Sequence, residues 1–316
     1  MTGGFRHQAV LYGSVDELAT AVTPLLHDTL SLRDSTVLVV TSSANAEAMR
    51  GELGELADHL EWLDPASGNS SPAVRFDTLL RSLADRSDGN RRAHIVHEEA
   101  PGEDYPGKLR EYLRYEAVTN VVFAAFRTPV LCLWDRRRYS QGVLDAVRRT
   151  HPELVQDGHP ARSPSYAEPE HYLAESARTL ELASPEMTEV WHELTALTAL
   201  AGLRQSLQHW ARGWGMGAEP SEDLVTAAHE VAANGLEHGA APVWVRAWRE
   251  REGLVCEVGD GGSGPIDPLA GYRRPAAGQA RGRGLWLARQ LADLVEVSTH
   301  PPGTRIRLHF AHRPGT

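Results

Sequence analysis

The first 150 residues alternate between short apolar segments and helix-like segments, which restricts the fold more than any other feature of the chain. Residues 36–40 (TVLVV) form a continuous run rich in β-branched residues, typical of a strand buried in a parallel sheet. Ser14 and Glu17 form a capping box that predicts a helix to about Leu30. Further strands are expected at 8–12, 59–63, 93–98 and 129–135, and helices at 44–57, 75–84, 108–126 and 140–150. The alternation indicates an α/β domain with a mostly parallel sheet.

The composition changes after residue 150. Residues 156–164 (QDGHPARSP) are polar and rich in Pro, Gly and Ser, as in a surface linker. A length of 316 residues suffices for two domains, each with its own core. We therefore expect an N-terminal domain at 1–155, a linker at 156–184 and a C-terminal domain at 185–316.

The C-terminal part predicts three helices and an antiparallel hairpin. Ser184 is a candidate cap, with Pro185 as first residue, for a long helix towards Trp214. A second helix, capped by Ser221 and stopped by Gly239, precedes strands at 243–248 and 254–258, and a short helix begins at Leu285. The turn Pro301-Pro302-Gly303 closes a final hairpin in which apolar residues of the first strand face those of the second. These apolar positions are Val295, Val297, Ile306, Leu308 and Phe310.

Charge and hydropathy limit the partners. The 32 basic and 42 acidic residues give a net charge of −10, which argues against direct nucleic-acid binding and favours a basic protein partner. Apolar runs are too short for a membrane span, and the N-terminus lacks a secretory pattern, so we expect a cytoplasmic location.

Cysteine and lysine usage limits the chemistry. Cys132 and Cys256 lie in apolar segments and are expected to be buried, reduced thiols; no Cys/His spacing suggests zinc. Lys108 is the only lysine. Many nucleotide sites place a lysine on the phosphates, so any phosphates here must be held by backbone amides, arginine or metal.

Four polar or glycine-rich patches follow one another in the C-terminal part. Glu230 and Asn234 share one helical face, where a carboxylate and a carboxamide can position water and offer oxygen to Mg²⁺. Asp260 opens the segment 260–265 (DGGSGP), and residues 282–285 (GRGL) open a helix whose N-terminal amides form an anion site. Gly303-Thr304 begins the final strand. Each patch alone is also compatible with an ordinary turn or solvated face.

Together, the ordered motifs ExxxN, DxGxG, GxGL and GT resemble the GHKL ATPase superfamily. The string at 282–293 (GRGLWLARQLAD) is especially similar to the anti-sigma-factor serine kinase branch, and the resemblance covers about 120 residues. It implies an α/β sandwich with a mixed sheet and binding of ATP or ADP with Mg²⁺. It assigns Glu230 as general base, Asn234 as Mg²⁺ ligand and Asp260 as acceptor for the adenine amino group.

The resemblance also implies a set of residues around the nucleotide: Gly262, Gly264, Gly282, Arg283, Gly284, Leu285 and Thr304. Gly262 and Gly264 would shape the pocket, Gly282 and Gly284 would lie on the phosphates, and Thr304 would contact the adenine side or its bound water. The implied partners are a sigma factor and an anti-anti-sigma protein with a STAS domain. A homodimer is implied as well.

The N-terminal 150 residues resemble the MEDS sensory domain, an α/β module similar to the RecA-like fold but without a nucleotide loop. The supporting segments are 7–12, 115–117, 131–135 and 151–152. Six residues are candidates for the lining of a ligand pocket or for ordinary core and turn positions: His7, Tyr12, Glu98, Trp134, Asp135 and His151.

The function expected from this combination is an anti-sigma factor that phosphorylates serine or threonine of its STAS partner under control of the sensory domain. Two alternatives stay open. One is an anti-sigma module that binds ATP without phosphotransfer. The other is a sensor histidine kinase, because His192-Glu193-Leu194 imitates a phospho-accepting motif, although the span between His192 and Asn234 has no room for the two-helix hairpin that such a kinase needs.

Overall fold

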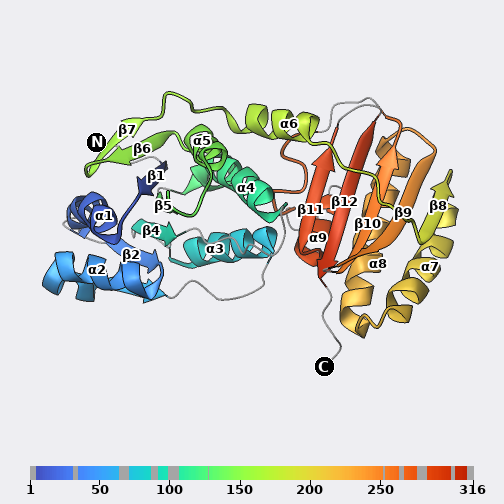
Figure 1. Cartoon of the computed structure of the whole chain (residues 1–316), viewed down its shortest axis with the longest axis horizontal. Coiled ribbons are helices and arrows are strands. Elements are labelled where there is room, and N and C mark those ends of the chain that lie inside the picture. The colour runs from blue at the N-terminus through green and yellow to red at the C-terminus, as the bar shows by residue number, and fades with distance from the viewer. Residues whose placement is uncertain are drawn as a thin grey trace. The chain divides into compact units, whose positions relative to one another are not determined.

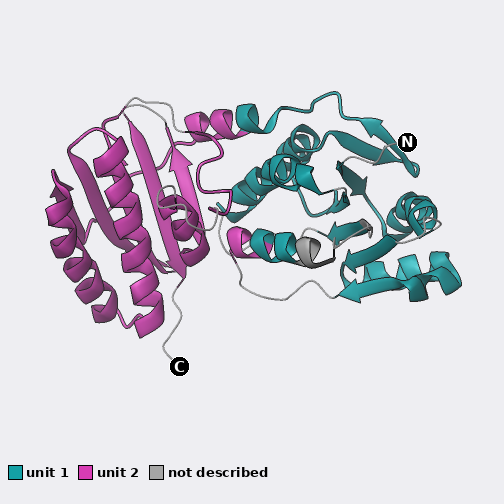
Figure 2. Cartoon of the chain, turned by 180° about the vertical axis from the view of Figure 1, so that it is seen from behind, with its two compact units in different colours: residues 1–69, 76–172 teal, residues 70–75, 173–316 magenta. Residues whose placement is uncertain are grey.

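The computed structural model describes residues 5–30, 35–63, 71–86, 92–98, 107–126, 128–251, 253–262, 267–275, 283–299 and 303–311. The chain forms two compact units, one of residues 1–69 and 76–172 and one of residues 70–75 and 173–316 (Figure 2). Each unit contains its own sheet and helices, as the α/β class predicts. Among the described residues, no helix combines the length and apolarity needed to cross a bilayer.

The first unit is built on a seven-stranded sheet with the order β3-β2-β4-β5-β1-β6-β7 (Figure 1). Its strands are β1 (Arg6–Tyr12), β2 (Ser35–Val40), β3 (Leu60–Leu63), β4 (Arg92–Glu98), β5 (Pro129–Asp135), β6 (Glu153–Gln156) and β7 (His159–Arg162). All described pairings are parallel except that of β6 with β7. The mostly parallel sheet expected from the alternation is confirmed.

Helices cover this sheet. They are α1 (Val15–Leu30), α2 (Ser43–Leu53), α3 (Pro72–Arg86), α4 (Lys108–Val122) and α5 (Gln141–Thr150), with short 3₁₀ turns η1 (Gly54–His59) and η2 (Phe123–Ala125). The predicted capping box forms in part: Ser14 Oγ accepts the Glu17 N–H at 3.1 Å, whereas the Glu17 carboxylate accepts the N–H of Gly13, one residue before the cap, at 2.7 Å. The core on one face joins α1 and α2 to alternate strand residues such as Val10 and Leu133.

The hairpin β6–β7 was not expected from the sequence. It crosses the predicted boundary at residue 155, so that its turn and β7 lie in the segment predicted to be linker, and Asp157 and Gly158 connect its strands with φ of 47° and 75°. An Asp-Gly pair is the usual signal for such a two-residue turn. Helix α6 (Pro169–Thr179) lies in the same predicted linker, so much of that segment has regular structure.

The second unit contains a five-stranded sheet with the order β11-β12-β10-β9-β8. Its elements are β8 (Val190–Leu194), η3 (Leu197–Ala199), α7 (Leu200–Gly213), α8 (Ala218–His238), β9 (Val243–Glu250), β10 (Gly253–Asp260), α9 (Gly284–Leu291), β11 (Leu294–Ser298) and β12 (Thr304–Ala311). Within the described segments every strand pair of this sheet is antiparallel, whereas the resemblance implied a mixed sheet.

Two local predictions in this unit are wrong. The long helix expected from Ser184 to Trp214 is replaced by β8, η3 and α7. Pairing with β9 buries Val190 and Leu194 of this segment and outweighs the local helix signal. Ser221 does not cap α8, which begins three residues earlier; its buried hydroxyl donates to the Ala218 carbonyl and accepts a hydrogen bond from Gln208. Gly239 ends α8 as predicted.

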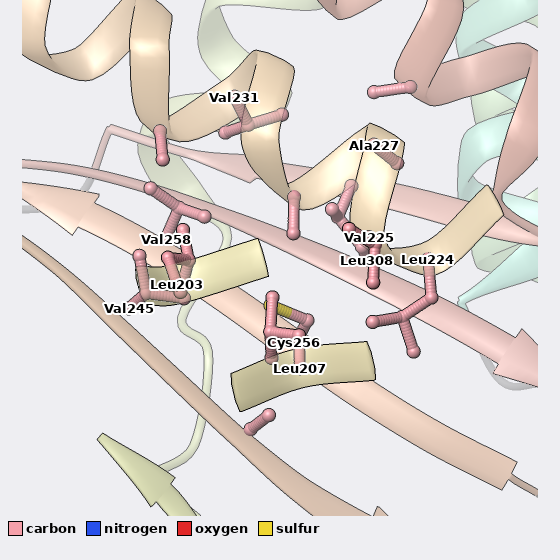
Figure 3. Packing of buried hydrophobic residues seen from close by; sticks show 14 of the residues in the cluster. Leu203, Leu207, Leu224, Val225, Ala227, Val231, Val245, Cys256, Val258 and Leu308 are labelled. Carbon is pink, nitrogen blue, oxygen red and sulfur yellow. The ribbon is translucent and has the colours of Figure 1, made fainter. Parts of the chain in front are cut away.

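The main core of this unit lies between the sheet and helices α7 and α8. Figure 3 shows side chains of this core from α7, α8, β9, β10 and β12, with Cys256 among them. Cys256 is fully buried, and burial raises the pKa of its thiol to about 12. Cys256 is therefore an inert core thiol, as expected.

The closing hairpin pairs as predicted, with Val295 opposite Leu308 and Val297 opposite Ile306. The turn residues 301–302 lie outside the described residues. Every residue of β11 is buried, including the polar residues Glu296 and Ser298.

Residues 177–183, which we call the connector, accept hydrogen bonds from side chains of β11 and β12. Arg305 and Arg307 donate to the carbonyls of Leu182 and Ala183 at 2.8 and 2.6 Å, and Ser298 Oγ donates to the Leu180 carbonyl. The connector therefore supplies acceptors that the buried polar side chains of β11 and β12 need.

Candidate functional site

Helix α8 places Glu230 and Asn234 one turn apart on the same face, as their spacing predicted. Both residues are half-buried. Within the part of the chain that the structure describes, neither side chain makes a hydrogen bond. Their oxygen atoms are therefore available to a ligand on this side of the helix.

The N-terminus of α9 lies directly against this pair. A β-carbon added to Gly284 would lie 2.7 Å from Asn234 Nδ2 and 3.0 Å from Glu230 Oε2, so a side chain at this position would collide with the pair. Arg283, immediately before α9, is exposed, and Leu285 packs against the core. The structure thus brings together three of the predicted site residues from two helices far apart in sequence.

Asp260, at the end of β10, is tied to the segment that follows α8. Its Oδ1 accepts the Gly262 N–H at 2.7 Å and the Ala240 N–H at 3.4 Å. A β-carbon on Gly239 would lie 2.8 Å from the Asp260 Cγ. Asp260 therefore lies at the C-terminal end of α8.

Thr304 begins β12 opposite Asp260. The preceding Gly303 has φ of 108°, and a β-carbon there would lie 2.0 Å from the Asp260 carbonyl oxygen. Only glycine allows this close backbone approach. Thr304 is largely buried beside the same strand end, so Asp260, Gly262 and Thr304 form a second group.

Helix α8 connects the two groups. Asn234 belongs to the first group, and Gly239, five residues further on, contacts the second. Five helical residues correspond to about 7.5 Å along the axis. The predicted residues Gly264 and Gly282 lie outside the described residues. Of the predicted residues that the structure describes, Glu230 and Asn234 lie on α8, Gly284 lies against it and Asp260 lies near its C-terminal end.

In the first unit, the six predicted pocket residues do not form one group. Tyr12 and Glu98 lie on the side of α1 and α2, where Tyr12 donates to Glu98 at 3.4 Å and accepts from Asn45 at 3.0 Å. Burial raises the pKa of Tyr12 to about 12. Asp135 binds Arg137 at 2.7 Å, and hydrogen bonds from that arginine lower the pKa of the carboxyl.

The other three predicted pocket residues lie on the opposite side of the sheet from Tyr12 and Glu98. Trp134 is fully buried and packs edge-on against Tyr139. His7 and His151 lie with their ring centroids 4.1 Å apart, and burial lowers the pKa of His7 to about 4. Glu116 and Cys132 lie beside the two histidines, a grouping that no sequence spacing indicated.

Comparisons with known proteins agree with the division of the chain into two units. Residues 194–310 match the family model of the histidine kinase-like ATPase domain, and residues 6–152 match that of MEDS, the methanogen/methylotroph DcmR sensory domain. No curated protein matches the chain.

One similar solved structure is that of the RsbU and RsbW domains of Rv1364c from Mycobacterium tuberculosis, with 23% identity and a TM-score of 0.30. The match covers 40% of this chain and 34% of that chain, about a third of its length. The two family matches together account for most of the sequence and correspond to the two sheets. The first unit thus carries a region that matches the MEDS family, and the second carries one that matches the histidine kinase-like ATPase family.

Proposed function

We propose that the C-terminal domain binds ATP or ADP with Mg²⁺ and that the protein is an anti-sigma factor with serine/threonine kinase activity toward an anti-anti-sigma partner. One arrangement carries the proposal. Gly284 contacts Glu230 and Asn234 in the first group of site residues, and Asp260 of the second group lies at the end of the same helix.

The residues present fit a magnesium nucleotide. A carboxamide and a carboxylate are hard oxygen donors of the type that Mg²⁺ prefers. The missing side chain at Gly284 leaves the amides at the start of α9 accessible to phosphate oxygens. Exposed Arg283 adds positive charge next to these amides, in the role that lysine has in other nucleotide sites.

The second group fits an adenine. Both hydrogen bonds to Asp260 from backbone N–H groups go to Oδ1. Among the described residues Oδ2 has no hydrogen bond, so it can accept one from an exocyclic amino group. In the proposal Gly262 and Gly264 shape this pocket and Thr304 contacts the adenine side or its water.

In the proposed kinase reaction, Glu230 would accept the proton of a serine or threonine hydroxyl of the partner while that oxygen bonds to the γ-phosphorus, the bond from the γ-phosphorus to the β-phosphate oxygen breaks and ADP leaves. Gly282, Gly284 and the Mg²⁺ ligand Asn234 stabilise the charge on the phosphates. The pairing of Glu230 and Asn234 on one helical face supports this assignment.

The proposed partners are a sigma factor and a STAS-domain anti-anti-sigma protein that competes with it. The similarity of residues 282–293 to anti-sigma kinases and the net charge of −10 support protein partners over nucleic acid. In the same proposal the protein is a homodimer, and a small-molecule ligand of the MEDS domain regulates the kinase.

An ATP-binding anti-sigma module without phosphotransfer is the second candidate, since the same contacts would hold nucleotide without catalysis. The sensor histidine kinase is disfavoured by the fold. His192 lies in strand β8 and pairs with Val245 of β9, whereas a phospho-accepting histidine belongs on a helical hairpin.

The deciding experiment is mass spectrometry of a candidate STAS protein from the same genome after incubation with this protein, ATP and Mg²⁺. A mass increase of one phosphate, located on serine or threonine, supports the kinase. Nucleotide binding and sigma-factor binding with no phosphate on any STAS protein would instead select the binding module.

A further inference from the structure

Four ligand-type side chains meet in the interior of the MEDS domain. His7 comes from β1, Cys132 from β5, Glu116 from α4 and His151 from the residue after α5. All four residues are buried, and their ligand atoms lie within 4.8 Å of one another. Side chains alternate along a strand, so His7 and Cys132 lie on the sheet face opposite the α1–α2 core.

The distances within the cluster are close to those of a coordination shell. Glu116 Oε2 lies 3.0 Å from His7 Nε2 and 3.2 Å from His151 Nε2. Cys132 Sγ lies 3.4 Å from His7 Nε2 and 3.5 Å from Glu116 Oε2. Ligands bound tetrahedrally to zinc at their usual bond lengths are about 3.3–3.8 Å apart.

The other nitrogen of each imidazole is already held by an oxygen. His7 Nδ1 lies 3.0 Å from Asn120 Oδ1, and the amide nitrogen of Asn120 donates to the Thr150 carbonyl at 2.8 Å, which fixes the orientation of that amide. His151 Nδ1 lies 2.8 Å from the Val147 carbonyl. These oxygens accept, so both Nδ1 atoms donate.

In a neutral imidazole with a proton on Nδ1, the Nε2 atom carries a lone pair. Both Nε2 lone pairs then face the carboxylate of Glu116 and the sulfur of Cys132, so four electron-rich atoms converge in a buried space. Histidines that bind metals donate their second N–H to a carbonyl or carboxylate in the same way.

The charge of the cluster also favours a metal cation as its ligand. Among the described residues Glu116 has no arginine or lysine partner, which leaves a carboxylate deep in the domain beside two imidazoles. A divalent cation bound to one carboxylate, one thiolate and two neutral imidazoles makes the site neutral. Thiolate and imidazole select zinc over Mg²⁺ or Ca²⁺.

We propose that His7, Glu116, Cys132 and His151 bind one zinc ion. The Cys132 thiol loses its proton to solvent on binding. With four protein ligands the site is closed, so the zinc is structural and joins β1, β5, α4 and the end of α5. Such an ion holds the face of the sheet opposite α1 and α2 to its covering helices.

The test uses the purified full-length chain, incubated with zinc and desalted, with metal content measured by mass spectrometry. Wild type should retain about one zinc per chain, and Cys132→Ser should lose most of it. The matched control is Cys256→Ser, which removes the other buried cysteine from the core of the ATPase domain and should retain zinc like wild type. Circular dichroism establishes that each variant is folded.

Cobalt substitution of wild type reports the thiolate directly and needs no variant. Cobalt-loaded wild type and Cys256→Ser should show a thiolate-to-cobalt charge-transfer band in the near ultraviolet, and Cys132→Ser should not. The proposal is overturned if folded wild type retains neither metal, or if folded Cys132→Ser retains both in full.

Discussion

Asn234 and Gly284 touch across two helices: a β-carbon on Gly284 would lie 2.7 Å from Asn234 Nδ2. The carboxamide of α8 therefore sets how large the residue at the start of α9 can be. In the proposed site this contact joins the metal ligand to the phosphate-binding amides, so it determines where the phosphates lie relative to Mg²⁺.

Gly284→Ala should weaken ATP binding by about tenfold or more, because the added methyl group displaces Asn234 and Glu230, and each 1.4 kcal/mol of lost binding energy is a factor of ten. Isothermal titration calorimetry measures the affinity. Gly202→Ala is the matched control, since a β-carbon there has no neighbour within 4 Å. Equal affinities for wild type and Gly284→Ala would show that this contact does not contribute to nucleotide binding.

Asn234→Ala should abolish the effect of Mg²⁺ on nucleotide affinity, because the variant lacks the carboxamide oxygen that is proposed to bind the ion. Calorimetric titrations with ATP are compared in Mg²⁺ and in EDTA for both proteins. The variant should bind ATP equally in both buffers, at the affinity of wild type in EDTA. A full Mg²⁺ effect in the variant would place the ion elsewhere.

Glu230→Gln should lower the rate of phosphotransfer to the STAS partner by about 10²–10⁴-fold while leaving ATP affinity unchanged, because the carboxamide keeps the shape of the side chain but not its basicity. Phosphate incorporation over time gives the rate, and a sigma-factor pull-down should be unaffected. Glu237→Gln, on the exposed surface of α8, is the control. A wild-type rate in Glu230→Gln would exclude this residue as the base.

Glu257 is fully buried between Arg246 and Arg307, with its oxygens 2.6 Å from each guanidinium. Glu257→Gln removes the negative charge and leaves both arginines without their counter-ion, so the free energy of unfolding should fall by about 3–5 kcal/mol. Urea denaturation measures it. Exposed Glu193→Gln should change it by less than about 0.5 kcal/mol. Equal losses in the two variants would show that the buried ion pair does not stabilise the domain.

Glu98 should give the MEDS domain a pH-dependent stability. Burial raises the pKa of Glu98, but the N–H of Ser42 and the hydroxyl of Thr41 donate to its carboxylate at 2.6 and 2.7 Å and hold the pKa below its usual 4.5. A carboxyl with a lowered pKa in the folded state contributes stability that is complete above its unfolded pKa. That stability is lost as the pH falls through the folded pKa.

The measurement is urea denaturation of wild type and Glu98→Gln between about pH 7 and pH 3. At pH 7 the variant should be less stable by about 1–3 kcal/mol, and the difference should shrink as the pH falls below about 4.5. Glu55→Gln, on the exposed surface of η1, controls for the loss of one charge. A difference that stays constant over this range would mean that Glu98 is protonated throughout.

Sequence patterns predicted the central strands and their helices because these carry strong periodicity. The strands that were missed are short and lie at or next to a sheet edge. β8 and β6 have five and four residues, and their pairing partners lie elsewhere in the chain, so tertiary contacts rather than local preference determine them. The Asp157-Gly158 turn was the one local signal for the β6–β7 hairpin.

The sequence likewise predicted the site of the ATPase domain but not the cluster in the MEDS domain. Ordered motifs placed Glu230, Asn234 and Asp260 correctly on α8 and at the end of β10, because each motif carries its own structural context. No such context marks the MEDS cluster. Its ligands come from four elements, and Cys132 and His7 are separated by 125 positions in the sequence, so only the parallel register of β1 and β5 brings them together.

The connector has a practical consequence for work on the ATPase domain alone. Leu180, Leu182 and Ala183 contribute main-chain oxygens, which any amino acid provides, so evolution can vary these side chains but cannot delete the segment. A fragment that starts at residue 185 would leave Ser298, Arg305 and Arg307 without these carbonyl acceptors. A soluble, stable version should instead begin before Ala177.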